Sequence, residues 1–346
     1  MNDYPEQHDT LEGIPAPAEN PSLVGHAEAG AMLAAAHRAG KLPHALLLAG
    51  PAGIGKATFA FHLAHHLFRH PEPANAPAGL SVINPDSTPF RLVANAAHPS
   101  LLHLMRPPTD NGKGFKTVIS VGEVRKVGQF LSLTAHDGGW RVVIVDPADD
   151  MNRAAANALL KNLEEPPTRT VFILIAHSLG RLLPTIRSRC QVVRLQPLAT
   201  DETLRVLQEL GMDLPQSEAG RAALAERANG SPRAGILLTQ YGGIEIAEAL
   251  DKAARERDIG AWHKLADAVA ARDGAVHFEL FNRHALDMLT GEAAAAARGN
   301  DIVRANSLAE TWQAALNAIT EAEEYNLDRK QHALTMIERL NAAMRM

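Results

Sequence analysis

Short apolar runs alternate with longer amphipathic segments over residues 21–195, and three of the runs are continuously apolar. We predict strands at residues 45–49, 101–105, 141–145, 171–176 and 191–195, and helices at residues 26–39, 56–69, 121–133, 152–164 and 179–187. Strands that are apolar throughout and joined by helices form parallel sheets that are covered on both faces. The pattern therefore predicts an α/β domain, a parallel sheet with helices on both faces.

The sequence after residue 197 predicts helices only. A short helical segment covers residues 201–238, a Tyr-Gly-Gly break follows at 241–243, and Ala-rich helices extend to residue 345. We expect a small helical domain and then a helical bundle. The predicted boundaries are a tail at 1–20, the α/β domain at 21–196, the small helical domain at 197–243 and a C-terminal helical domain at 244–346.

Three segments interrupt or precede this pattern. Residues 71–99 and 106–116 are rich in turn-forming Pro, Asn and Gly, so we predict surface excursions there. Residues 1–20 are acidic, contain three prolines and lack both the basic and the apolar region of a signal peptide. We expect these first residues to form a loose, disordered tail.

Composition limits the class of protein. A length of 346 residues is more than one core usually supports, so two or three domains are expected. The formal net charge of −5 lacks the cationic surplus needed to neutralise DNA phosphates, so any contact with DNA must be local or shared. The lone cysteine, Cys190, excludes an internal disulfide and a four-thiolate zinc site. With no long apolar run either, we expect a soluble, cytoplasmic protein without a membrane contact.

A glycine-rich turn joins the first predicted strand to the next helix. Gly50, Gly53, Gly55 and Lys56 have P-loop spacing, in which glycine N–H groups surround phosphates and the lysine reaches the outer ones. These residues predict an ATP or ADP site. The magnesium-binding Ser or Thr of this motif is replaced by Ala57.

The metal and water positions of this site are incomplete. Thr58 is the nearest hydroxyl, but one residue along a helix is a rotation of about 100°. Asp146 ends an apolar strand, as a metal-polarising aspartate does, yet Pro147 follows where an ATPase carries a water-orienting Glu. Asp149 and Asp150 could replace that Glu, although we favour them as caps of the next helix. We therefore expect weak or absent nucleotide binding and negligible hydrolysis by the chain alone.

Several strings resemble the clamp-loader branch of the AAA+ family, and most closely the family of delta-prime subunits of bacterial DNA polymerase III. The strings are Leu42 to Leu48, Gly50 to Lys56, Asn157 to Pro167, Ser188-Arg189-Cys190, Gly230 to Arg233 and Asn326 to Lys330. The Asn157 to Pro167 string and the Ser-Arg-Cys triplet are the most specific. The resemblance covers most of the chain beyond residue 20.

The resemblance implies an AAA+ core, a small helical lid and a helical collar that joins a ring of five subunits. The implied partners are the gamma/tau motor subunits, the delta subunit, the sliding clamp and, through the assembly, primed DNA. The implied role is that of a stator, which helps to load the clamp during replication. Zinc is not expected, because the four-cysteine module of many relatives has no counterpart in residues 71–99.

Two arginines receive roles from the resemblance. Arg189 is implied to be an arginine finger that reaches the ATP of the adjacent motor subunit, and Arg233 a sensor arginine of the lid. The residues alone also allow a salt bridge from Arg189 to Glu164 or Glu165, and an ordinary helix-terminal role for Arg233. We interpret Cys190 as a small buried hydrophobe.

Four histidines, His62, His65, His66 and His70, share one predicted helix. Spacing of four residues can chelate a metal, but no Cys or carboxylate joins them, so we interpret them as a solvated helix flank. The alternative function is a self-sufficient AAA+ ATPase such as the motor subunit. That function calls for Ser or Thr at position 57 and Glu at 147, and neither is present.

Overall fold

The structure is a computed structural model, and it describes residues 4–110, 112, 114–132, 138–271, 275–325 and 327–345. Parts of several predicted segments lie outside the described residues. They include residues 1–3 of the tail, residues 111 and 113 of the excursion at 106–116, Leu133 at a predicted helix end and Asn326 in one of the family strings. The chain divides into two compact units. One comprises Met1–Gly211 with Ser217–Arg233, and the other Met212–Gln216 with Ala234–Met346.

A five-stranded parallel sheet forms the centre of the first unit, in the order β2-β3-β4-β1-β5. The strands are β1 (Ala45–Ala49), β2 (Leu101–Leu104), β3 (Arg141–Val145), β4 (Thr170–Ala176) and β5 (Gln191–Arg194). All five predicted strands are confirmed to within one residue. Every residue of β1, β3 and β4 is buried, as the continuously apolar runs indicated.

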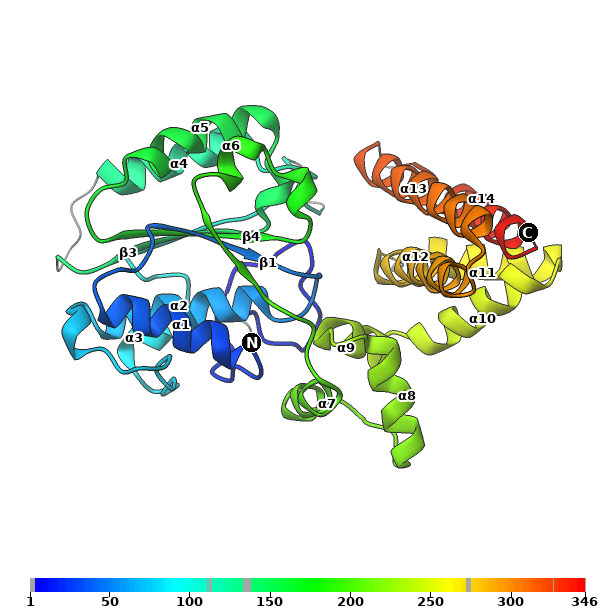
Figure 1. Cartoon of the computed structure of the whole chain (residues 1–346), viewed down its shortest axis with the longest axis horizontal. Coiled ribbons are helices and arrows are strands. Elements are labelled where there is room, and N and C mark those ends of the chain that lie inside the picture. The colour runs from blue at the N-terminus through cyan, green and yellow to red at the C-terminus, as the bar shows by residue number, and fades with distance from the viewer. Residues whose placement is uncertain are drawn as a thin grey trace. The chain divides into compact units, whose positions relative to one another are not determined.

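Helices cover both faces of this sheet (Figure 1). One layer holds α1 (Ala27–Arg38), α2 (Lys56–Arg69) and α3 (Thr88–Ala94), and the other α4 (Val121–Ser132), α5 (Arg153–Glu164) and α6 (Pro184–Arg187). Each layer of helices packs on its face of the sheet and forms an apolar core there. The first core contains Phe59 and Leu63, and the second contains Val127 and Leu159. The predicted α/β class is confirmed.

Two details of these helix layers differ from the sequence prediction. The excursion at residues 71–99 contains α3 and a 3₁₀ turn, η1 (Pro73–Asn75). The helix predicted at 179–187 is a 3₁₀ turn, η3 (Leu179–Arg181), followed by α6. Pro184 separates them, because proline pushes the preceding Leu183 out of the helical region.

Residues 4–20 pack against the first core instead of forming the expected loose tail. Tyr4, Leu11 and Ala18 are 6%, 5% and 2% exposed. The Tyr4 ring meets the edge of Phe61 at a centroid distance of 5.7 Å. A few spaced apolar side chains are enough to hold this segment, although its overall composition is polar.

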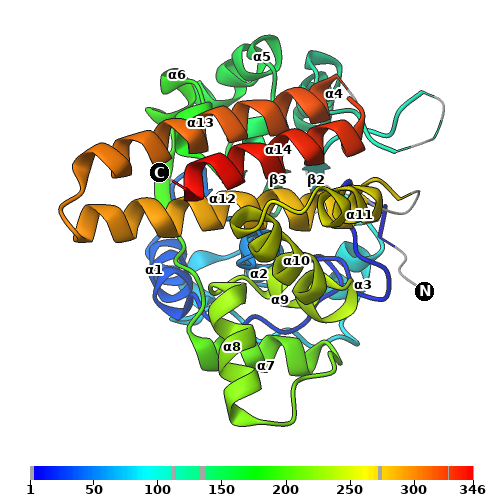
Figure 2. The same ribbon diagram turned by 90° about the vertical axis from the view of Figure 1, so that its right-hand side faces the viewer.

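Helices make up the remainder of the chain. They are α7 (Thr200–Glu209), α8 (Glu218–Ala228), α9 (Pro232–Gln240), α10 (Gly243–Arg255), α11 (Ile259–Ala270), α12 (Ala275–Arg298), α13 (Ile302–Glu324) and α14 (Arg329–Met344). In the second unit α12, α13 and α14 lie side by side (Figure 2), with Phe281, Leu289 and Ile337 buried. The division between the units falls within α9, and the predicted domain boundaries at 196 and 243 stay predictions.

Gly243, the first residue of α10, is closely packed. A Cβ at this position would lie 2.9 Å from both the Leu237 carbonyl oxygen and the Leu238 Cα, so a larger residue has no room. Within the described part of the chain, no helix combines the length and apolarity needed to cross a membrane.

Candidate nucleotide and arginine sites

The P-loop turn joins β1 to α2 as predicted, and it is tightly packed. Gly53 and Gly55 have φ values of +75° and +94°, which side-chain-bearing residues rarely adopt. A Cβ on Gly50 would lie 2.4 Å from the Leu195 oxygen, and one on Gly53 would lie 2.4 Å from Ser231 Oγ. The three glycines are therefore required by backbone conformation and by close neighbours.

Lys56 turns back into its own loop. Its Nζ donates hydrogen bonds to the Gly50 oxygen at 2.7 Å and to the Pro51 oxygen at 2.5 Å, and the residue is 3% exposed. Burial lowers the pKa of Lys56 to about 8, while Asp146 and Asp149 act in the opposite direction. The ammonium group is thus satisfied by loop carbonyls.

The carboxylate at the end of β3 is also turned inward. The Asp146 side chain is 13% exposed, and its Oδ2 lies 3.9 Å from His103 Nε2. His103 Nδ1 shares a 2.8 Å hydrogen bond with the hydroxyl of Tyr4. Burial, reinforced by the charge of Asp9, raises the pKa of Asp146 to about 7. Burial therefore favours the uncharged form of this carboxyl relative to a free aspartate.

Asp149 ties the loop after β3 to the end of β4. Its carboxylate accepts the backbone N–H of His177 at 3.2 Å and that of Ser178 at 3.2 Å. Burial lowers the pKa of His177 to about 4, so its imidazole is neutral at pH 7. Two backbone donors thus fix the orientation of the Asp149 carboxylate.

The predicted capping role of the two aspartates is wrong. The cap of α5 is Asn152, whose Oδ1 accepts the N–H of Ala155 at 2.9 Å. Asp150 instead pairs with Arg106 at 2.5 Å. Both aspartates lie in the 3₁₀ turn η2 (Ala148–Asp150), one turn too early to reach the free N–H groups of α5.

Arg233, which the resemblance implied to be a sensor arginine, lies against the P-loop. Its backbone N–H donates to the Gly53 oxygen at 3.3 Å, and its Nη1 donates to the backbone oxygen of Asp9. The Asp9 carboxylate lies 4.0 Å from the same Nη1. The N-terminal segment thus supplies a partner that no motif in the sequence indicated.

Thr58 lies next to the position that lacks a hydroxyl. Thr58 is half-buried in the first turn of α2, and the preceding Ala57 packs against the apolar core. The structure therefore brings Gly50, Gly53, Gly55, Lys56, Asp146 and Arg233 together, and it leaves position 57 without a hydroxyl.

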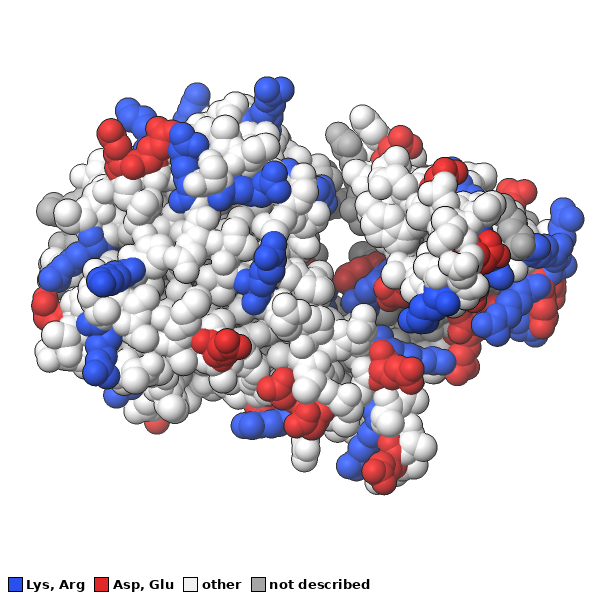
Figure 3. All heavy atoms as spheres, in the orientation of Figure 1, with Lys and Arg blue, Asp and Glu red and all other residues white. Residues whose placement is uncertain are grey.

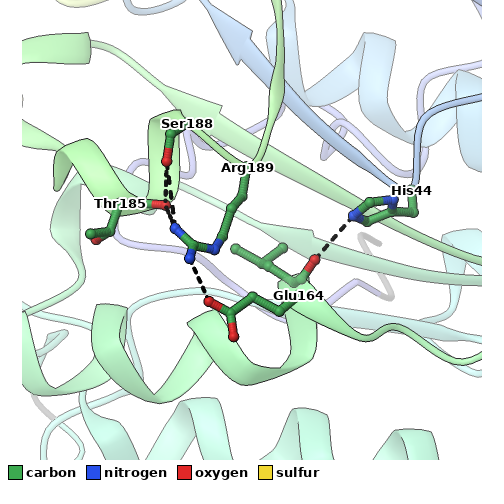
Figure 4. Close-up of polar contacts among 6 residues, drawn as sticks. His44, Glu164, Thr185, Ser188 and Arg189 are labelled. Carbon is green, nitrogen blue, oxygen red and sulfur yellow. Dashed lines mark hydrogen bonds and ion pairs between the residues drawn. The ribbon is translucent and has the colours of Figure 1, made fainter.

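Arg189 occupies a different place, between α6 and β5 on the outer surface. Its side chain is 37% exposed, and its Nη2 lies 2.6 Å from Glu164 Oε1. Its Nη1 donates to the Thr185 oxygen at 3.0 Å and approaches Ser188 Oγ at 3.5 Å (Figure 4). The salt bridge to Glu164, one of the two alternatives in the sequence, is confirmed.

The surroundings of Arg189 are basic. Figure 3 shows blue side chains, with fewer red ones among them, over the part of the first unit where α5 and α6 lie in Figure 1. Lys161, Arg181 and Arg187 are exposed in these elements or next to them. Cys190 is half-buried against the second core, and burial raises the pKa of its thiol to about 11, so it is a poor nucleophile.

The histidines of α2 are buried, so the interpretation of a solvated flank is wrong. His62, His65 and His66 are 4%, 1% and 0% exposed. His66 lies 3.2 Å from His37 through one ring nitrogen and 3.1 Å from Ser81 Oγ through the other. The covering comes from the N-terminal segment and the 71–99 excursion. Among the described residues, no three or more His, Cys, Asp or Glu side chains form a metal-binding group.

The five-stranded parallel sheet, the P-loop after β1 and the aspartate after β3 define a P-loop protein of the AAA+ class. The sequence model of one family, described as "DNA polymerase III, delta subunit", matches residues 25–199. The chain is 43% identical to the DNA polymerase III subunit delta' of Pseudomonas aeruginosa over 147 residues, which are 42% of this chain and 41% of that one. It is 32% identical to the Escherichia coli subunit delta' over 238 residues, 68% of this chain and 67% of that one. The chain belongs to the family of DNA polymerase III delta' subunits.

A solved structure gives a further likeness. The DNA polymerase III gamma subunit-related protein of Thermotoga maritima is 16% identical, with a TM-score of 0.44 over 88% of this chain and 97% of that one. The sequence alignment with the Pseudomonas aeruginosa relative spans less than half of either protein.

Proposed function

We propose that this chain is a stator subunit of a clamp loader, and that it supplies Arg189 to the nucleotide held by the adjacent motor subunit. The observation that supports the proposal is the difference in solvent exposure between Lys56 and Arg189. The P-loop cation Lys56 is 3% exposed and bonded to its own loop, whereas the side chain of Arg189 is 37% exposed on a basic surface. The chain is therefore better equipped to act on a neighbour's phosphates than on its own.

The chemistry of Arg189 suits this role. A guanidinium is planar and permanently charged, and its fork of N–H donors matches phosphate oxygens. An arginine finger stabilises the charge that develops on the transferred phosphoryl group, and it is worth roughly 10³ to 10⁵ in rate. Arg189 lies two residues before β5, a strand that pairs with β1, so its backbone is held close to the sheet.

The chain's own nucleotide site is proposed to bind ATP or ADP weakly or not at all, and to hydrolyse none. Ala57 offers no hydroxyl to magnesium, Pro147 offers no carboxylate to water, and Asp146 has a pKa of about 7. Arg233 is already bound by Asp9. We propose no zinc site in this chain.

The proposed partners follow from family membership and from charge. They are the gamma/tau motor subunits and the delta subunit in a ring of five, the sliding clamp, and primed DNA shared among the subunits, in the cytoplasm. A formal charge of −5 supports DNA contact through the assembly instead of by this chain alone. The basic surface over α5 and α6 is the part best suited to a phosphate-bearing neighbour.

The test is phosphate release by a reconstituted assembly of motor subunits, delta subunit and this chain, stimulated by primed DNA and clamp. Arg189→Ala is expected to slow hydrolysis roughly 10³-fold or more at the one site it serves. Size-exclusion chromatography must show unchanged assembly. An unchanged rate in fully assembled rings would overturn the proposal.

A further inference from the structure

Glu164 holds the guanidinium of Arg189 within the chain. Its Oε1 lies 2.6 Å from Nη2, while the Thr185 oxygen accepts from Nη1 at 3.0 Å. Figure 4 shows the carboxylate reaching from the end of α5 toward the guanidinium. Two edges of the guanidinium are therefore engaged by the chain itself.

The position of Glu164 makes this pairing favourable. It is the last residue of α5, where the unpaired carbonyls create partial negative charge, and Glu165 follows it. A second contact fixes this helix end, because His44 Nε2 hydrogen-bonds the oxygen of Leu163 at 3.0 Å. A carboxylate held at the negative end of a helix favours a cation beside it, and Arg189 is that cation.

We propose that Glu164 is a latch for Arg189, an inference that rests on the proposed function. Carboxylate and phosphate oxygens bind a guanidinium through the same charge-assisted N–H···O contacts, so they compete for it. Glu164 occupies the Nη2 edge while the neighbouring site is empty, and it yields that edge to the phosphates of a bound nucleotide. The guanidinium is thereby kept in place and partly neutralised until it has a substrate to contact.

The strength of the pair fits a reversible latch. The two side chains are 37% and 48% exposed, so solvent screens their attraction. Ion pairs of this kind shift an equilibrium by about fivefold or less. Nucleotide phosphates carry more charge than one carboxylate, so they can displace it.

Glu165 provides a matched control. It is exposed, it carries the same charge one residue further along, and the described contacts contain no ion pair for its side chain. Glu164→Gln removes the latch with little change in shape. Glu165→Gln removes the same charge from the same helix end and leaves the Arg189 contact intact.

The first measurement uses the isolated chain. Modification of Arg189 by phenylglyoxal, followed by peptide mass spectrometry, reports how free the guanidinium is. Glu164→Gln is expected to speed the modification by about two- to fivefold, while Glu165→Gln matches wild type. Equal rates in all three proteins would show that the carboxylate does not hold Arg189 in solution, and would overturn the latch.

The second measurement uses the reconstituted assembly at several ATP concentrations, with Arg189→Ala alongside. The latch predicts that Glu164→Gln lowers the ATP concentration for half-maximal hydrolysis by up to about fivefold, with no change for Glu165→Gln. A lower rate in Glu164→Gln, or equal behaviour of the two glutamine variants, overturns the latch. No effect of Arg189→Ala overturns the proposed function itself, so the two failures are distinguishable. Thermal melting of each variant confirms that the fold is retained.

Discussion

The P-loop and the Arg189 surface each present one cation that could meet a nucleotide, and they differ in what already surrounds it. Lys56 is bonded to two carbonyls of its own loop, and the nearby Asp146 has a pKa of about 7. Arg189 is held by one exposed carboxylate and backbone oxygen on a basic surface. The comparison teaches that a motif reports backbone geometry, whereas burial and existing partners decide whether a cation is available to a ligand.

The largest expected effect concerns the planar pair of N–H donors on the Arg189 guanidinium. Arg189→Lys keeps the charge but loses the planar pair of donors, so hydrolysis at the neighbouring site is expected to fall by roughly 10²-fold or more. Phosphate release by the reconstituted assembly measures this. Arg38→Ala, at an exposed cation on α1 in the other helix layer, serves as the control and is expected to leave the rate unchanged. Equal losses in both variants would reduce the role of Arg189 to general surface charge.

Acid is expected to destabilise the unit that contains the P-loop. Burial lowers the pKa values of His65 and His66 to about 4, against about 6.5 in an unfolded chain. Because the folded state favours the neutral rings, the stability they contribute is complete above pH 6.5 and is lost as the pH falls toward 4. Each ring accounts for at most about 3 kcal/mol.

Urea unfolding between pH 7.5 and 5 tests this pH dependence. His65 is the sharper probe, because neither of its ring nitrogens has a hydrogen-bond partner among the described residues. His65→Leu is expected to flatten the dependence, whereas His263→Gln, at an exposed position of the second unit, is expected to leave it unchanged. A dependence that persists fully in His65→Leu would assign the acid sensitivity to other groups.

A smaller effect tests how tightly the P-loop is closed. Gly53→Ala places a Cβ 2.4 Å from Ser231 Oγ and 2.6 Å from Arg233 Cβ, at a φ of +75°. Gly40→Ala, at a φ of +67° with nothing within 4 Å, isolates the backbone cost. The extra loss in unfolding free energy at Gly53 is expected to be about 1–3 kcal/mol. Equal losses would mean that the contact with residues 231–233 yields easily.

The smallest expected effect is none at all. The isolated chain is expected to release phosphate from ATP at background rate, and Lys56→Ala is expected to leave both this rate and that of the assembly unchanged. Phosphate-release assays on the chain and on the ring measure the two rates. Steady release by the wild-type chain that disappears in Lys56→Ala would make it a self-sufficient ATPase and reverse the comparison between the two sites.

Much of this arrangement was predictable from local sequence. Continuously apolar runs predict the strands because burial on both faces leaves no polar position, and the P-loop glycines predict their own tight turn. The salt bridge from Arg189 to Glu164 is one of the two alternatives that the residues allow. The short helix α3 was not predicted, because its surroundings are rich in Pro and Asn, a composition that indicates a loop.

Contacts between distant segments could not be foreseen. Tyr4 meets His103 across 99 positions, and Arg233 meets Asp9 across 224. Neither pairing leaves a periodic or motif signal, because each depends on where two separate segments arrive in the fold. The assignment of Asp149 as a cap failed for a related reason, since its donors come from the end of another strand.

The parallel pairing of β1 with β5 gives the domain a direction. Leu46 pairs with Gln191 and Ala49 with Arg194, so Arg189 precedes the amino end of this ladder and the P-loop follows its carboxyl end, about 15 Å along. If Arg189 serves a neighbour's nucleotide as proposed, the two ends of this ladder face different neighbours, as in a heterologous, head-to-tail contact. A subunit that uses only its Arg189 end would then serve a neighbour on one side, and it would form the end of the row.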